Sequence, residues 1–235
     1  MISAMIVADS ISPSGVRLTT MELNYHRFIH SEFMTHRMFS RNATSSRAIP
    51  VSTMLSLVRD NPAIPIHWGK NQPGMQAREE LTQEDLEEAT ERCFIAREKS
   101  GDKYADFPNW WYAFTESHEG FDEFGGGSFQ KDPLSIQEVL YQEWVGMARE
   151  AAKSAEELNQ LGLHKQIVNR VLEPFQWIKV IVTATEWDNF FKLRLHKDAQ
   201  PEIQELARCM RKAMWDSTPT LLQPGEWHLP YVENE

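Results

Sequence analysis

The alternation of apolar and polar positions predicts strands near both ends of the chain. Residues 1–7 and 17–24 are rich in apolar and β-branched side chains, and they flank a Ser-Pro-Ser-Gly turn at 12–15. This arrangement predicts a β-hairpin at the start of the chain. Residues 177–183 are apolar and β-branched enough to form a further strand.

Helical periodicity and capping signals predict the remaining elements. Thr82 with Asp85, and Ser135 with Glu138, resemble capping boxes, which predict one helix to about residue 99 and another to about residue 158. We therefore expect an α+β fold that combines a mixed sheet with long helices. The other expected helices cover residues 28–34, 51–58, 187–195 and 199–214.

The helix after Ser135 carries one apolar stripe. The stripe is expected to face the core or a subunit interface, and we assign it no chemistry. Its members are Ile136, Leu140, Trp144, Met147, Ala151, Ala155 and Leu158.

Two stretches lack such periodicity. Residues 61–74 are rich in turn formers and predict a long loop, which either lies over a binding site or is an inert surface excursion. Residues 104–130 contain three consecutive glycines at 125–127, which predict a flexible loop rather than a phosphate loop. The candidates there for stacking on the ring of a bound ligand, with core packing as the alternative, are Trp110, Trp111 and Phe114.

Composition favours one domain in a reducing compartment. The chain has 235 residues, 41% of them hydrophobic, so we expect a single domain over 1–235 with an aromatic and glycine-rich insertion at about 100–133. No apolar run reaches the roughly 18 residues of a membrane span, and the N-terminus lacks a signal-peptide pattern. Cys93 and Cys209 are interpreted as small buried residues. We expect a cytoplasmic protein without a membrane partner.

The charge changes sign in one segment of this acidic chain. The formal net charge is -10, yet within residues 26–47 Arg27, Arg37, Arg41 and Arg47 face one acid, Glu32. Guanidinium groups and the neighbouring hydroxyls suit phosphate oxygens. We expect a small phosphorylated ligand and no nucleic acid, which usually needs a broader basic surface. The alternative is a polar loop that caps a helix and pairs with nearby acids.

Separated motifs resemble those of the flavin-dependent thymidylate synthases. The triplet at 35–37, Thr-His-Arg, is followed after seven residues by Ser45, similar to the family's R-H-R signature and its later Ser. Residues 189–194 and 199–203 resemble the late N-x-x-x-x-R…A-Q-x-E-I stretch, and 169–174 resembles A-R-x-x-L-P. The region between these motifs is unlike ordinary members, and shorter virus-encoded members offer the better comparison.

The resemblance implies roles for individual residues. Arg194 is implied to favour ionisation of the pyrimidine N3, because a fixed cation lowers the pKa of a ring nitrogen and stabilises developing negative charge. The alternative for Arg194 is a surface salt bridge with Asp198 or Glu202. The residues implied to hold FAD are His36, Arg37, Asn42 and Asn189. Those implied to bind the nucleotide are Glu32, Thr44, Ser45, Ser46, Arg47, Arg170 and Arg194.

Three residues depart from the family pattern. Thr35 stands where arginine is usual, Glu32 where glutamine is usual, and Ala43 where glutamate is usual. An ionised Glu32 accepts hydrogen bonds but cannot donate them, so at the base edge it would favour the amino group of cytosine. If Glu32 instead serves a ribose hydroxyl or an arginine, base preference should not depend on it.

A zinc site is the competing interpretation of the histidines. His26, His30 and His36 lie near Glu32 in the sequence. However, the chain lacks a His-Glu-x-x-His motif and any pair of neighbouring cysteines, so we expect no metal.

The resemblance also implies the reaction and the assembly. It implies an FAD-dependent one-carbon transfer from methylenetetrahydrofolate to C5 of dUMP, which yields dTMP, with NADPH as reductant. It also implies a homotetramer whose active sites are shared between subunits. The alternatives are flavin-dependent 5-hydroxymethylation of dUMP or dCMP, and a non-catalytic nucleotide-binding or assembly protein.

Overall fold

The computed structural model describes residues 1–74, 76–100, 108 and 134–232. Its contacts divide the chain into two compact units, Met1–Ile66 with Ala148–Glu235, and His67–Met147. Every residue that the resemblance assigns to a ligand belongs to the first unit. The glycine triplet and the three aromatic residues proposed for ring stacking lie outside the described residues, as does nearly all of the expected insertion.

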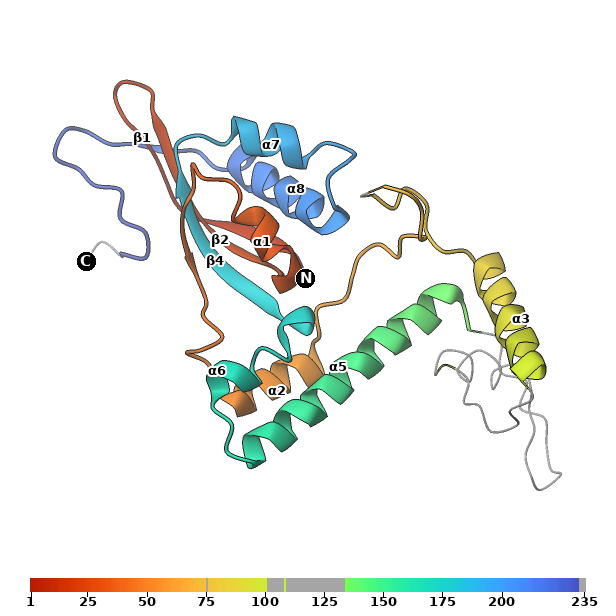
Figure 1. Ribbon diagram of the computed structural model, residues 1–235. Coiled ribbons are helices and arrows are strands. Elements are labelled where there is room, and N and C mark those ends of the chain that lie inside the picture. The colour runs from red at the N-terminus through yellow and green to blue at the C-terminus, as the bar shows by residue number, and fades with distance from the viewer. Residues whose placement is uncertain (75, 101–107, 109–133, 233–235) are drawn as a thin grey trace, which may run out of the picture. The chain divides into compact units, whose positions relative to one another are not determined.

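A five-stranded mixed sheet forms the centre of the first unit (Figure 1). Its strands are β1 (Ser3–Ile11), β2 (Arg17–His26), β3 (Ser40–Ala43), β4 (Trp177–Ala184) and β5 (Thr220–Leu221), in the spatial order β3-β4-β2-β1-β5. β5 runs parallel to β1, and all other neighbours are antiparallel. The predicted hairpin is confirmed, with Gly15 at a φ of 86°, which glycine adopts without a Cβ clash.

Alternate strand positions build the core on one face of the sheet. Side chains of β2 and β4 are buried there because successive residues of a strand point to opposite faces. In Figure 1, α7 (Asp188–Arg194), α8 (Pro201–Trp215) and the short α1 (His30–Phe33) lie on this side. The buried residues are Met21, Leu23, Tyr25, Val180 and Val182 on the strands, and Ile203, Leu206, Ala207 and Met210 at helical spacing on α8.

The C-terminal segment crosses the opposite face of the sheet. His228 Nδ1 lies 2.9 Å from Ser10 Oγ, and its Nε2 lies 2.8 Å from Thr20 Oγ1. The Tyr231 hydroxyl donates to Glu22 Oε2 at 2.9 Å. This segment is therefore held on β1 and β2, away from α7 and α8 (Figure 1).

Short turns and three further helices complete the first unit. The 3-10 turns η1 (Arg27–Ile29) and η2 (Glu173–Phe175) are joined by a hydrogen bond from Arg27 N to Gln176 O of 2.8 Å. An ion pair of 2.6 Å joins Arg59 of α2 to Glu156 of α5. The helices of this part are α2 (Val51–Asp60), α6 (Lys165–Val168) and the C-terminal portion of α5 (Ile136–Gln160).

The second unit contains α3 (Gln83–Ser100) and the start of α5. Both predicted capping boxes are confirmed. Thr82 N donates to Asp85 Oδ2 at 2.9 Å, and Asp85 N donates back to Thr82 Oγ1 at 3.3 Å. Ser135 and Glu138 repeat these reciprocal bonds at 2.9 and 3.3 Å. None of the helices formed by the described residues combines the length and apolarity that crossing a membrane requires.

Three local expectations were wrong. Residues 40–43, for which no strand was expected, form β3, because β4 offers an edge for pairing. The stripe of α5 is correct at Ile136 and Ala155 but wrong at Met147, which is 48% exposed, while the neighbouring Ala148 is buried. Cys93 and Cys209 are half-buried rather than buried.

Candidate functional site

A cavity of about 500 Å³ lies where the signature segment meets α7. Residues 35–39 form one part of its wall, and Glu186, Asn189, Phe190, Leu193 and Arg194 form the other. The two segments meet because both flank the same end of β4, where Ser40 pairs with Thr183. The fold thus brings together four of the residues implied in ligand binding: His36, Arg37, Asn189 and Arg194.

An aromatic cluster forms part of the cavity wall and packs behind it. The Phe39 ring lies 4.7 Å from Trp187 and 5.2 Å from Phe190, measured between ring centroids. The rings of His36 and Phe190 form a T-shaped pair, with their centroids 4.8 Å apart. These contacts fix the signature segment against α7, since tilted and edge-on aromatic pairs are the favourable geometries.

Arg194 is the centre of the polar network at the cavity. Its Nη1 pairs with Glu32, its Nε donates to His36 Nε2 at 2.8 Å, and its Nη2 donates to Thr35 Oγ1 at 3.3 Å. Two of the three departures from the family pattern, Glu32 and Thr35, therefore contact the same guanidinium. The salt bridges considered for Arg194 in the sequence, with Asp198 or Glu202, do not form.

His36 is held neutral by its surroundings. Burial, followed by the positive charges of Arg194 and Arg41, lowers the pKa of His36 from 6.5 to about 4. Because arginine can only donate, His36 Nε2 must accept the bond from Arg194, which places the ring proton on Nδ1. His36 is thus an uncharged hydrogen-bonding group at neutral pH.

Arg37 and Asn189 offer free donors at the cavity. Both side chains are exposed, and neither makes an ion pair or hydrogen bond with any residue that the structure describes. Asn42 lies elsewhere: it is exposed on β3 opposite Ile181, on the sheet face that points away from the core. The structure therefore gathers three of the four residues implied in FAD binding, and Asn42 is not among them.

A second cluster surrounds the nucleotide stretch at 44–47. The buried Asn169 donates through Nδ2 to Ser46 O at 2.7 Å and to Ile49 O at 3.1 Å. Thr44, Ser45 and Arg47 are exposed on this loop, whereas Ser46 is buried. Asn169 thereby fixes the loop beside Arg170, the next residue in the chain.

Arg170 is engaged by a carboxylate. Its Nη1 donates to Glu173 Oε1 at 2.7 Å, and Arg27 Nη2 donates to the same oxygen at 2.8 Å. Burial and the nearby charges of Arg27 and Arg41 lower the pKa of His30, so it adds no charge to this cluster at neutral pH. Two arginines of the basic segment at 26–47 thus differ. Arg27 is paired with Glu173, whereas Arg47 makes no ion pair within the described part of the chain.

The two clusters lie beyond opposite ends of β4. The cavity follows Ala184, whereas Arg170 and Glu173 precede Trp177. β4 has eight residues, and seven steps of roughly 3.3 Å separate its ends by about 23 Å. The cavity and the Arg170–Glu173 pair of one chain therefore lie at opposite ends of β4.

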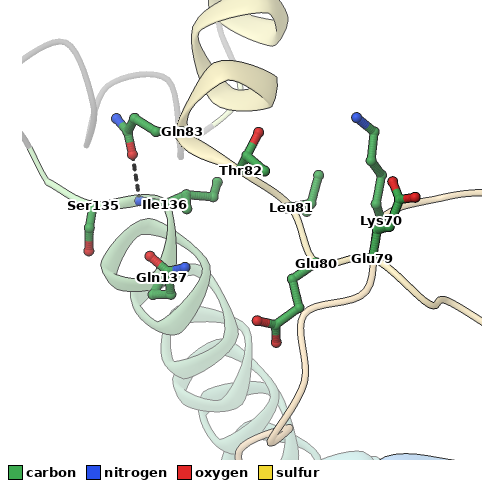
Figure 2. Close-up of a pocket in the computed structure, with 9 residues that line it drawn as sticks. All are labelled: Lys70, Glu79, Glu80, Leu81, Thr82, Gln83, Ser135, Ile136 and Gln137. Carbon is green, nitrogen blue, oxygen red and sulfur yellow. Dashed lines mark hydrogen bonds between the residues drawn. The ribbon is translucent and has the colours of Figure 1, made fainter.

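A larger cavity of about 690 Å³ lies in the second unit (Figure 2). It is lined by Lys70, by residues 79–83 and by residues 135–137, and Gln83 Oε1 accepts a hydrogen bond from Ile136 N at 2.9 Å. None of the residues implied in ligand binding lines it. Lys70 there is paired with Asp85, so we assign the chemistry to the smaller cavity.

Sequence reasoning missed the structural role of one motif residue. Glu202, in the stretch at 199–203, is buried, and its carboxylate accepts from Ile66 N and Gln200 Nε2, both at 3.1 Å. His26 Nε2 lies 2.6 Å from Ile64 O, which anchors the same loop. The motif therefore fixes the start of α8 and the loop at 61–66.

Fold and site together define the class of protein. It is an α+β protein whose cavity, at one end of β4, presents guanidinium and amide donors and a neutral imidazole. The loop at 44–47, towards the other end of β4, presents hydroxyls and an arginine. The chain belongs to the thymidylate synthase complementing protein family, that of the flavin-dependent thymidylate synthases, whose model matches residues 12–220 of 235. This family makes thymidylate in a flavin-dependent reaction. No curated protein matches the chain at a significant level.

Proposed function

We propose that the protein transfers a one-carbon unit from methylenetetrahydrofolate to C5 of dUMP and yields dTMP, with FAD as cofactor and NADPH as reductant. The observation that carries the proposal is the convergence of His36, Arg37, Asn189 and Arg194 on one cavity, from two segments far apart in the sequence. We further propose that residues 1–235 act as one family domain with an insertion at about 100–133.

The cavity residues fit a flavin dinucleotide. A volume of about 500 Å³ lies within the range of roughly 300–1,000 Å³ usual for cofactor sites. Arg37 suits a diphosphate, because it is a cation with exposed donors, and Asn189 supplies both a donor and an acceptor for a ring edge. When bound, FAD supplies the hydride that the one-carbon unit requires. The protein's share is to bind, orient and polarise the reacting groups.

Arg194 is proposed to act on the pyrimidine. Three of its five N–H donors are engaged by His36, Glu32 and Thr35, which leaves two for a base edge. A guanidinium held in this way needs little reorganisation before it stabilises negative charge on the base. Because Glu32 is committed to Arg194, it need not read the base, and we propose uracil as the substrate base.

The phosphate of the nucleotide is assigned to the loop at 44–47. Its hydroxyls and the exposed Arg47, together with Arg170, supply charge-assisted hydrogen bonds. Chemistry between flavin and nucleotide needs reacting atoms roughly 3–3.5 Å apart, whereas the two clusters lie at opposite ends of β4. We therefore propose that a second copy of the chain completes each site, within a homotetramer, and that Asn42 acts across that interface.

Two measurements test the proposal. Purified protein should be yellow, with a flavin absorption spectrum, whereas a non-catalytic nucleotide-binding protein would be colourless. Protein, FAD, NADPH and methylenetetrahydrofolate should then convert dUMP to a product in which a methyl group replaces the C5 hydrogen, as identified by mass. Turnover of dCMP alone would refute the substrate, and addition of a hydroxymethyl group would refute the product. An Arg194→Gln variant should retain flavin and lose turnover.

A further inference from the structure

Glu173 places a carboxylate inside the arginine cluster that the proposed function assigns to phosphate. One oxygen of this residue, Oε1, accepts from Arg27 at 2.8 Å and from Arg170 at 2.7 Å. Carboxylate and phosphate oxygens accept the same charge-assisted hydrogen bonds from arginine, so Glu173 Oε1 occupies donors that a phosphate oxygen could use. Both distances are typical of charge-assisted hydrogen bonds.

The backbone fixes this arrangement. Arg27 begins η1 and Glu173 begins η2, and the two turns are joined by the bond from Arg27 N to Gln176 O. The Arg27 and Glu173 side chains are 16% and 29% exposed, so solvent screens their pairing only in part. The Arg170 side chain is 53% exposed, which leaves its remaining donors open to a ligand.

The carboxylate also lies next to the nucleotide loop. Arg170 follows Asn169, whose amide holds the carbonyl of Ser46 at 2.7 Å. A phosphate that approached Arg47 and Arg170 would therefore meet a negative charge already bound to Arg170. The phosphate dianion would be repelled by that charge and would compete for the same donors.

We propose that Glu173 is a positioning residue that holds Arg27 and Arg170 together and competes with the nucleotide phosphate for their donors. It sets the affinity for phosphate-bearing ligands below what the arginines alone would give. This inference rests on the proposed function for the identity of the nucleotide, but not for the competition with phosphate itself.

The test compares two variants at Glu173 with a matched control. Glu173→Gln keeps the size of the side chain and removes its charge, and Glu173→Ala removes the side chain beyond Cβ. Glu156→Gln is the control, since it removes the same charge from the ion pair with Arg59 on α2. Titration calorimetry of the flavin-loaded proteins measures binding of dUMP, deoxyuridine and inorganic phosphate.

Both Glu173 variants should bind dUMP about tenfold more tightly, the scale of one charge-assisted contact, and deoxyuridine no more tightly. The control should match the unaltered protein. In turnover, Glu173→Gln should lower KM for dUMP without raising kcat, which a general loss of structure would not do. Where the unaltered protein binds dUMP, an unchanged or weaker dUMP affinity in both variants would overturn the proposal, as would an equal gain in Glu156→Gln.

The two proposals fail separately. If the unaltered protein makes dTMP while the Glu173 variants gain no affinity for dUMP or inorganic phosphate, the competition is refuted and the reaction stands. If no form binds dUMP, while both variants bind inorganic phosphate about tenfold more tightly, the competition stands and the proposed substrate is wrong.

Discussion

Acidification should destabilise the protein because His36 takes up a proton, and replacing His36 with glutamine should remove this loss of stability. The pKa of this residue is lowered from 6.5 to about 4, first by burial and then by Arg194 and Arg41. Between those two values the unfolded chain binds a proton at His36 that the folded protein does not. The free energy of unfolding must therefore fall as the pH drops from about 6.5 towards 4.

The magnitude follows from the size of the shift. Lowering the pKa of His36 from 6.5 to about 4 corresponds, at face value, to about 3 kcal/mol in the free energy of unfolding. His36 lines a cavity, and solvent there screens part of the interaction, so we reduce the expected effect to roughly 1–2 kcal/mol. Most of it should appear between pH 7 and pH 5.

The assay is urea unfolding of the unaltered protein and of His36→Gln at pH 7, 6 and 5. Glutamine can still accept the hydrogen bond from Arg194 but cannot be protonated, so the two proteins should converge in stability by about 1 kcal/mol on acidification. Burial also lowers the pKa of His26, His30 and His228, which makes the difference between the proteins the informative quantity. Met38→Gln, at an exposed position in the same cavity, is the control. Parallel curves for the unaltered protein and His36→Gln would refute the reasoning.

Three further predictions concern other parts of the chain. Arg47→Ala and Ser45→Ala should each weaken dUMP binding about ten- to a hundredfold and leave flavin bound, because each removes a contact to phosphate; unchanged affinities in calorimetry would contradict this. Replacing both Cys93 and Cys209 with alanine should preserve turnover, because both are half-buried outside the cavity and burial raises the pKa of the Cys209 thiol; loss of all activity in a folded, flavin-loaded double variant would reveal a missed nucleophile. Thr82→Ala should lower the free energy of unfolding by about 0.5–2 kcal/mol, because it removes the cap of α3, and an unchanged urea midpoint would contradict that role.

The capping boxes and the hairpin could be predicted from the sequence because their signals are local. Thr82 and Asp85 are three residues apart, and their reciprocal bonds depend on little else. The strand β3 could not be predicted in the same way. Its sequence, Ser-Arg-Asn-Ala, has no β-branched residue and no apolar alternation, so it forms a strand only because the edge of β4 is available.

The candidate site was predictable in its members but not in its contacts. The motif resemblance named His36 and Arg194, and in the structure Arg194 Nε lies 2.8 Å from His36 Nε2. No pattern in the sequence indicated that Glu32 and Thr35 would both contact Arg194, because the pairing depends on how β4 brings α7 to the signature. The same holds for Glu173: its bond to Arg27 joins residues on two turns that only the folded sheet brings together.

The C-terminal segment determines where the polypeptide can be truncated for experiments. The family match ends at residue 220, within β5, so a polypeptide trimmed to that boundary would lose His228 and Tyr231 together with part of β5. Thr20 and Glu22 would each lose a hydrogen-bonding partner, and Ile11 at the β1 edge of the sheet would lose its neighbour Leu221. Unpaired strand edges promote association between chains. Oligomeric states measured on such a trimmed protein would therefore mix native assembly with edge-to-edge pairing, and the full chain is the form in which to count subunits.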